Sequence, residues 1–211
     1  HYFNSGKIFD EVNTLESDHG YYYMPVKQMF FKDDVVVTSP EYTMHSDTMK
    51  YQTETKVISI LGPTTIYGEN RTLYSEDGWY NSLTAHSELY KNNKISFNTY
   101  HGSADTIVAD SATNMIIMRS AIHLLDSINN MIVEGNYGEM YKETNYAFIT
   151  DSALLTMVGN PDSLFLHADT LTLKQEVRDT IEVSVVDAYR RVSMFNRDLQ
   201  AICDSMSFDT K

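Results

Sequence analysis

Short runs in which apolar and polar residues alternate follow one another along nearly the whole chain. In "DTMKY" (47–51), Met49 and Tyr51 would face one side of a strand and Lys50 the other. Such alternation, bounded by Gly, Pro, Asn or Asp, is typical of a β-strand with one buried face. The pattern predicts an all-β protein, with strands near residues 7–9, 13–16, 21–24, 29–37, 41–51, 56–61, 64–67, 72–75, 79–90, 94–97, 100–110, 114–118, 120–125, 129–134, 139–149, 152–158, 164–174, 181–186, 190–195 and 199–208.

The segment 185–202 also fits a second interpretation. Its apolar residues recur at near-helical spacing, as Val185, Val186, Tyr189, Val192, Phe195, Leu199 and Ile202. An amphipathic helix therefore competes with strands there. We favour strands, because Leu199, Ala201 and Cys203 alternate with polar positions.

The chain also carries an internal repeat. Shifting the sequence against itself by 58 residues aligns 8–49 with 66–107 without a gap, and ten positions are identical. "TLESDHGYY" (14–22) and "TLYSEDGWY" (72–80) are the clearest pair. Repeats of this length indicate stacked supersecondary units, which we place at about 8–65, 66–121, 122–185 and 186–211.

A shorter phrase recurs four times, with Asp followed by Thr or Ser and then an alternating apolar run. The copies are "YTMHSDTMKY" (42–51), "YHGSADTIVA" (100–109), "LFLHADTLTL" (164–173) and "LQAICDSMSF" (199–208). Asp next to Thr or Ser suits a corner or bulge at which a strand begins. Gly20 and Gly78, which precede aromatic residues, predict hairpin turns with positive φ.

The apolar faces of these strands predict one continuous interior. Stacked units would line a long trough, for which the ordinary alternative is a packed core. The residues expected there are Val35, Val37, Met49, Tyr51, Ile58, Ile60, Ile66, Ile107, Ile116, Met118, Ile122, Leu124, Leu171, Leu173, Met206 and Phe208.

Composition excludes several classes of function. With 16 Lys and Arg against 29 Asp and Glu, the net charge of −13 repels nucleic acid and anionic bilayer surfaces. The longest apolar runs, such as "MIIM" (115–118), are far shorter than the roughly 20 residues that span a bilayer. We therefore expect no nucleic-acid partner and no direct membrane insertion. The start, "HYFNSGKIFDE", has no signal-peptide pattern, so we expect that any export signal is absent from this sequence.

No arrangement of reactive residues predicts catalysis. The seven histidines form no metal-binding pattern, and His45, His101 and His167 lie near the recurring Asp at different offsets. Asp47 and Asp105 occupy equivalent repeat positions and fit structural corners better than an acid/base pair. Ser111 and Ser152 lack a nucleophile elbow, and Cys203 lies on an apolar stretch. "FKDDV" (31–35) and "EDG" (76–78) are at most weak surface cation sites. We expect a non-enzymatic protein with no cofactor and no metal.

The order and spacing of these motifs resemble the OstA/LptA superfamily of periplasmic lipopolysaccharide-transport proteins, particularly OstA-like proteins of the Bacteroidetes type. The resemblance lies in "YTMHSDTMKYQTETKVISILGPTTIYGENRTLYSEDGWY" (42–80), "GSADTIVAD" (102–110), "IVEGNYGEMY" (132–141) and "LHADTLTL" (166–173). It implies an open-ended, twisted β-jellyroll, a solenoid-like stack of antiparallel strands whose apolar interior shields the acyl chains of lipid A. It also implies a periplasmic location and end-to-end strand pairing with other lipopolysaccharide-transport proteins or with further copies. The chain would then be a fragment of a longer protein.

Two other hypotheses stay open. The first is a structural repeat module of the cell envelope, with a filled interior and sheet edges that pair with partners by strand addition. The second is a β-solenoid glycosidase, which would need two carboxylates converging in a polar cleft.

Overall fold

The structure is a computed structural model that describes residues 1–9, 12–110, 112–159, 161–178 and 181–209. Within these ranges strands dominate, a 3-10 turn spans Met24–Val26, and there is no α-helix. The all-β, antiparallel class predicted from the sequence is therefore confirmed. The ambiguous segment 185–202 is strand rather than helix, because it falls in β18 and β19. No helix in the described residues is long and apolar enough to span a membrane.

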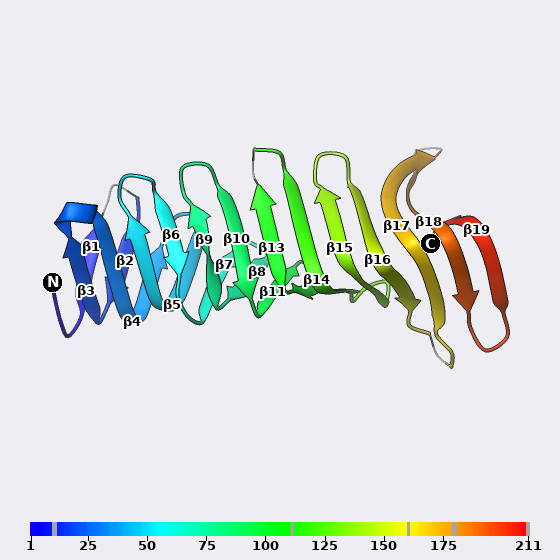
Figure 1. The fold of residues 1–211 in the computed structure, drawn as a ribbon, viewed down its shortest axis with the longest axis horizontal. Coiled ribbons are helices and arrows are strands. Elements are labelled where there is room, and N and C mark those ends of the chain that lie inside the picture. The colour runs from blue at the N-terminus through cyan, green and yellow to red at the C-terminus, as the bar shows by residue number, and fades with distance from the viewer. Residues whose placement is uncertain (10–11, 111, 160, 179–180, 210–211) are drawn as a thin grey trace. The chain divides into compact units, whose positions relative to one another are not determined.

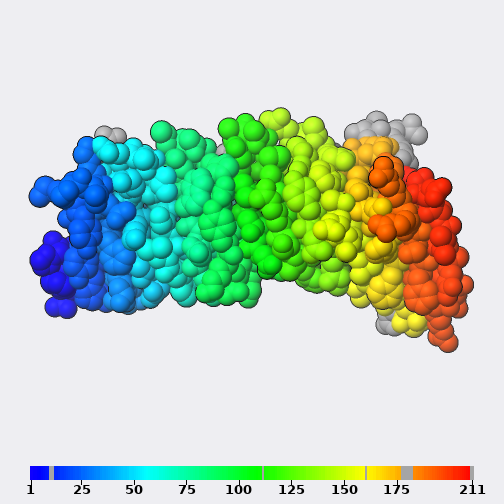
Figure 2. All heavy atoms as spheres, viewed as in Figure 1, coloured from blue at the N-terminus to red at the C-terminus, as the bar shows by residue number. Residues whose placement is uncertain are grey.

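The strands belong to two compact units. Unit 1 comprises His1–Asn98 and Thr106–Ala112, and unit 2 comprises Thr99–Asp105 and Thr113–Lys211. Within each unit, segments that follow one another in the chain lie side by side in chain order (Figure 2). The repeat boundaries drawn from the sequence remain a prediction.

Unit 1 is a sheet folded into two layers. Its strands are β1 (Gly6–Phe9), β2 (Thr14–Ser17), β3 (His19–Tyr23), β4 (Gln28–Thr38), β5 (Tyr42–Gln52), β6 (Val57–Ile60), β7 (Thr64–Gly68), β8 (Arg71–Ser75), β9 (Asp77–Asn81), β10 (His86–Lys91), β11 (Asn93–Phe97) and β13 (Thr106–Asp110). Layer A contains β3, residues 28–32 of β4, residues 48–52 of β5, β6, β9, β10 and β13. Layer B contains β1, β2, residues 35–38 of β4, residues 42–46 of β5, β7, β8 and β11.

Unit 2 repeats this plan with longer strands. They are β12 (Tyr100–Ala104), β14 (Met115–Asp126), β15 (Met131–Tyr141), β16 (Tyr146–Met157), β17 (Leu164–Arg178), β18 (Ile181–Phe195) and β19 (Gln200–Asp209), and β14 to β19 pair in chain order (Figure 1). Each long strand bends near its middle and contributes to both layers. Layer C contains the parts before the bend in β14, β16 and β18 and after it in β15, β17 and β19. Layer D contains the remaining parts together with β12.

The strands change layers at corners of two kinds. In the first, two consecutive residues adopt positive φ, as in Asp33–Asp34, Ser120–Ala121, Asp151–Ser152 and Arg190–Arg191. In the second kind, a single residue is left out of the strand pairing. It lies opposite a two-residue corner of the neighbouring strand. The recurring Asp47, Asp169 and Asp204 occupy such positions, and Asp105 lies in the bend between β12 and β13. The corner predicted from the repeated Asp-Thr/Ser phrase is therefore present in all four copies.

Small polar side chains support the corners of unit 1 from inside. Ser46 Oγ donates to the Thr48 carbonyl and lies 2.7 Å from Thr64 Oγ1. Further along layer B, Ser75 Oγ is 2.8 Å from Asn93 Oδ1, and Asn93 Nδ2 donates to the Leu89 carbonyl. These side chains are buried. Their hydrogen bonds provide partners for main-chain carbonyls that have no strand partner at the bend.

The hairpins of layer A recur at regular intervals. Lys27, Lys56 and Ala85 each end a hairpin turn in positive φ, and they are spaced 29 residues apart. The backbone N–H of Thr53 donates to the Lys27 carbonyl, and that of Ser82 to the Lys56 carbonyl. The 58-residue offset of the sequence repeat therefore corresponds to two successive hairpins of layer A.

Several details of the sequence-based prediction were wrong. The single strands expected at 79–90, 100–110 and 139–149 are each divided by a turn or corner, whereas 114–118 and 120–125 form one bent strand. Gly20 and Gly78 lie inside β3 and β9 rather than in hairpin turns. Gly78 has φ of 150°, and a Cβ there would lie 2.4 Å from the Glu88 carbonyl oxygen. Close approach of a neighbouring strand, rather than a turn, is what requires this glycine.

Candidate functional site

The apolar residues predicted to line the interior fall into three groups by burial. Ten are buried: Val35, Val37, Met49, Ile58, Ile60, Ile107, Ile116, Met118, Ile122 and Leu171. Tyr51, Ile66, Leu124, Met206 and Phe208 are half-buried, and Leu173 is exposed. Most of the predicted set therefore faces a packed interior.

In unit 1 these side chains join the two layers into one core. Val35, Val37, Met49 and Ile58 form a single buried cluster with Phe31 and Met44, and Tyr51 and Ile66 pack against it. In unit 2 the layers also face each other closely, since a Cβ on Gly138 of layer C would lie 3.5 Å from Ile122 Cδ1 of layer D. Near the corners, the interior is filled by the protein's own side chains.

Along several strands burial decreases with distance from the corner, although Met131 and Val186, which also lie far from a corner on inward faces, are buried. Leu171 is 4% exposed, whereas Leu173, two residues further from the corner on the same face, is 37% exposed. The same change separates buried Met49 from half-buried Tyr51, and buried Ile122 from half-buried Leu124. Each unit is thus sealed along its corners and presents apolar side chains at the outer margins of its inward faces, which we call the rim.

Other rim residues were missed by sequence reasoning. Tyr22, Phe97, Tyr100 and Met140 face inward by register and are exposed at strand ends. Arg71, which is also exposed, pairs in register with Phe97 and places a cation at the rim of unit 1. Their position at strand ends could be read only after the strand boundaries were known.

Buried residues were also missed, and the corners explain why. A one-residue corner reverses the alternation, so that Met44 before Asp47 and Met49 after it both face inward. Leu166 and Leu171 are related in the same way across Asp169. Strict alternation through each segment excludes Met44 and Leu166, because it assigns them to the opposite face from Met49 and Leu171.

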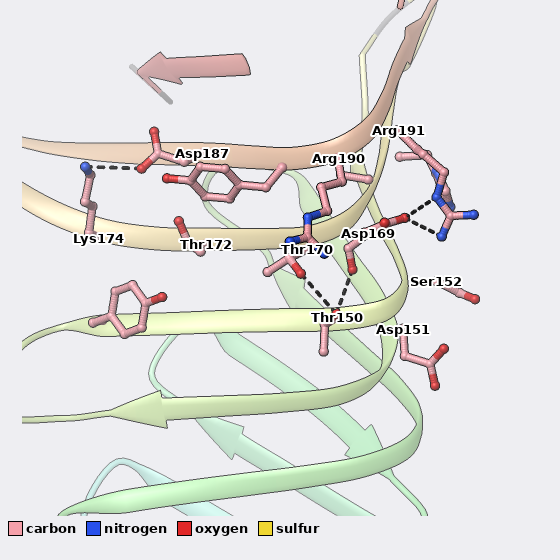
Figure 3. Close-up of a pocket in the computed structure, with 14 residues that line it drawn as sticks. Thr150, Asp151, Ser152, Asp169, Thr170, Thr172, Lys174, Asp187, Arg190 and Arg191 are labelled. Atoms are coloured by element: carbon pink, nitrogen blue, oxygen red, sulfur yellow. Dashed lines mark hydrogen bonds and ion pairs between the residues drawn. The ribbon is translucent and has the colours of Figure 1, made fainter. Parts of the chain in front are cut away.

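A second candidate site is a polar pocket on the outer face of layer C, wholly within unit 2 (Figure 3). Its volume is about 1130 Å³. Thr150, Thr170 and Thr172 come from the outward faces of β16 and β17, and Asp187 and Tyr189 from β18.

Two of the basic side chains in this pocket, Lys174 and Arg191, form ion pairs. Lys174 Nζ lies 3.1 Å from Asp187 Oδ2 and 2.9 Å from Glu176 Oε1. Arg191 Nη2 lies 2.6 Å from Asp169 Oδ1. Burial raises the pKa of Asp187, but hydrogen bonds from Ser207 and Lys174 outweigh it and leave this pKa below its ordinary value. Asp187 is therefore held as a carboxylate.

The sequence-based chemistry candidates are dispersed. His45 packs against Tyr67, His101 is exposed, and His167 lines the polar pocket. Asp33 of "FKDDV" lies in a corner and contacts His19, and Glu76 of "EDG" pairs with Lys91. Cys203 is a half-buried free thiol, and Ser152 lies in a corner. Ser111 lies outside the described residues. Within the described ranges, no group of three or more His, Cys, Asp or Glu side chains could hold a metal ion.

Comparisons with known proteins bear on these sites. The family described as "OstA-like protein" matches residues 1–47, which supports the resemblance and overlaps its first segment, 42–80, at residues 42–47. No curated protein matches the chain. Among solved structures, one match is LptH from Pseudomonas aeruginosa, titled as the LptA-homologous periplasmic component of the conserved lipopolysaccharide transport device. It has 10% sequence identity and a TM-score of 0.33, covering 66% of this chain and 82% of that chain.

Proposed function

We propose that this chain is a non-enzymatic, periplasmic module that holds the acyl chains of lipopolysaccharide against the apolar interior of its folded sheets during transport. The supporting observation is the change from buried to more exposed apolar side chains along inward faces, as from Met49 to Tyr51 in β5 and from Leu171 to Leu173 in β17. Together with the OstA-like match and the resemblance of the motifs further along the chain, it favours a lipid over a polar ligand.

The energetics of this proposal depend on the rim. Moving an acyl chain from water onto apolar side chains gains about 0.8 kcal/mol for each buried methylene. Tyr51, Leu124, Leu173 and Phe208 are partly exposed and offer such a surface, whereas buried residues such as Met49 and Leu171 form the floor beneath it. Several long chains can therefore be held without a reactive group. Arg71 at the rim supplies a cation for a lipid A phosphate, which the net charge of −13 would otherwise repel.

The proposed partners are other lipopolysaccharide-transport proteins or further copies of this chain. β19 pairs with β18 along one edge, and we propose that a partner's strand is added at its other edge. Such an edge offers unpaired N–H and C=O groups to an added strand.

A binding experiment tests the lipid proposal. Fluorescent lipopolysaccharide is titrated with the purified chain, and saturable binding that lipid A displaces is expected. Leu173→Glu should weaken binding by about tenfold or more, because a carboxylate among acyl chains lacks a partner. Leu199→Glu, which changes an exposed leucine in the turn between β18 and β19, is the matched control. Absence of saturable binding, or equal effects of the two variants, would refute the proposal.

The second candidate function is a structural module of the envelope. It is favoured by the interior near the corners, where Phe31, Met44 and Met49 belong to one cluster of buried side chains. Under this alternative, the chain would bind no lipopolysaccharide, while a peptide matching β19 would still compete for its partners.

A further inference from the structure

The outer pocket of unit 2 differs in chemistry from the apolar interior. It lies on the opposite face of the same strands, because Thr170 and Thr172 alternate with inward-facing Leu171. Thr150 Oγ1 lies 3.1 Å from Thr170 Oγ1 and donates to the Asp169 carbonyl at 2.7 Å (Figure 3). The hydroxyl groups of Thr150 and Thr170, on adjacent strands, therefore begin a row across the pocket that continues to Thr172, which is 8% exposed.

Aromatic rings accompany this row. Tyr146 and Tyr189 both line the pocket. The Tyr146 ring packs against Tyr141 and Phe148, with centroid distances of 6.0 and 6.4 Å. Neighbouring rings restrict its movement, so Tyr146 offers a preorganised apolar face with a polar tip. Sugar rings, which combine an apolar C–H face with hydroxyl edges, match such a surface.

The charges favour a neutral ligand over an anion. Three of the chain's 16 basic residues, Lys174, Arg190 and Arg191, line the pocket beside Asp151, Asp169 and Asp187. Lys174 and Arg191 are already paired with carboxylates, as shown in Figure 3. An anion would have to compete with Asp187 and Asp169 for these cations. A polyhydroxyl ligand would instead use cation donors and carboxylate acceptors together.

We propose that this outer pocket is a binding site for a short, neutral stretch of oligosaccharide, with Tyr146 and Tyr189 as ring platforms and the threonine row and ion pairs as hydrogen-bonding groups. The site is independent of acyl-chain binding in the interior. The sugar could belong to lipopolysaccharide or to another glycan, and both sources share the chemistry that the pocket recognises.

The test uses sugars that carry no lipid. The full chain is titrated with lipid-free core oligosaccharide from lipopolysaccharide and, separately, with N-acetylglucosamine oligomers, and binding is followed by amide chemical shifts in NMR. Saturable shifts at pocket residues are expected for at least one sugar. Tyr146→Ala and Tyr189→Ala should each weaken binding by about tenfold. Tyr23→Ala, an exposed tyrosine on the outward face of layer A, should leave it unchanged.

Each other result counts against the site. No saturable shift with either sugar, or shifts that both pocket variants retain, would overturn it. Displacement of the sugar by inorganic phosphate at equal concentration would replace it with an anion site. Since no acyl chain is present, failure here leaves lipid binding by the interior unaffected, and failure of lipid binding leaves this site unaffected.

Discussion

The two units fold a sheet over the same kind of corner with different side chains. In unit 1, most strands are broken at the corner into pieces of four to six residues, and buried Ser, Thr and Asn side chains satisfy the bend. In unit 2, strands of 10 to 15 residues run through the corner, where the bends adjoin Ala153, Ala168 and Val192, all 0% exposed. The same bend is thus stabilised in two ways: by side-chain hydrogen bonds in unit 1 and by small buried apolar side chains in unit 2.

The two units also differ in the side chains that fill them. Unit 1 encloses Phe31, Met44, Met49, Ile60 and Leu89 almost completely. At the corners of unit 2, the fully buried side chains include the small Ala153 and Ala168. The stability of unit 1 should therefore be more sensitive to the truncation of single large side chains. The stability of unit 2 should be more sensitive to substitutions that enlarge a side chain at its corners.

The largest expected effect comes from the core of unit 1. Phe31→Ala should lower the free energy of unfolding by about 3–5 kcal/mol, because it leaves a cavity between the layers. Phe165→Ala, an exposed cross-strand partner of Phe195, should cost about 1 kcal/mol or less. Chemical denaturation measures both values, and hydrogen exchange shows which unit is affected. Equal losses of unfolding free energy in the two variants would contradict the difference between a packed inward face and an exposed outward face.

Exchanging the corner chemistry should destabilise both units. Asn93→Ala removes the partner of Ser75 and of the Leu89 carbonyl, and should cost about 1–3 kcal/mol. Ala153→Ser places a hydroxyl where unit 2 has a fully buried methyl group, and should cost a similar amount, about 1–3 kcal/mol. Denaturation curves provide the measurement. A neutral Ala153→Ser variant would show that the two kinds of corner are interchangeable.

A smaller effect of opposite sign is expected within a two-residue corner. Ala121 adopts φ of 50°, which costs an alanine about 1 kcal/mol but a glycine almost nothing. Ala121→Gly should therefore stabilise the protein by about 0.5 kcal/mol. Ala201→Gly within β19 should destabilise it by about 0.5–1 kcal/mol, because glycine weakens a strand. Thermal unfolding distinguishes the signs, and destabilisation by both variants would contradict the role of the left-handed corner.

The smallest effect concerns the corner of unit 1 at Glu76. Hydrogen bonds from Asn92, Lys91 and Tyr74 lower its pKa from 4.5 to about 2. A lowered pKa stabilises the folded protein above the ordinary pKa, and this contribution is lost as pH falls toward the folded value. Glu76→Gln should thus be less stable than the original at about pH 6, with the difference vanishing near pH 2.

Denaturation across this pH range measures the effect. Glu41→Gln, in an exposed turn, is the control. A difference between Glu76→Gln and the original that persists unchanged at pH 2 would contradict the assigned cause.

Local patterns predicted the elements of the fold but not the way strands cross between layers. Alternation identified strands and ten buried residues because each layer has one buried face. Alternation assigned Met44 and Leu166 to the wrong face, because a single corner residue shifts the inward and outward positions of the strand by one. The Asp-Thr/Ser phrase marks those corners in the sequence. Whether such a corner reverses the inward and outward faces of a strand depends on how the neighbouring strand pairs with it.

The outer pocket could not have been found from sequence spacing. "DTLTLK" (169–174) shows an outward polar face, and Arg190–Arg191 stands out as a basic pair. Only the register of β16, β17 and β18 brings Thr150, Thr172 and Asp187 onto one surface. Such register depends on the two-residue corners, which have no common sequence among Asp33–Asp34, Ser120–Ala121 and Arg190–Arg191.

Site-specific photo-crosslinking to lipopolysaccharide shows which face of the folded sheets the lipid contacts. A photoreactive residue is placed at the inward-facing rim positions Tyr51 and Leu124, and at their outward-facing neighbours Lys50 and His123. If acyl chains lie against the inward faces, both units should crosslink at Tyr51 and Leu124 and not at Lys50 and His123. Equal crosslinking on the two faces, or none at Tyr51 and Leu124, would contradict lipid binding by the inward faces.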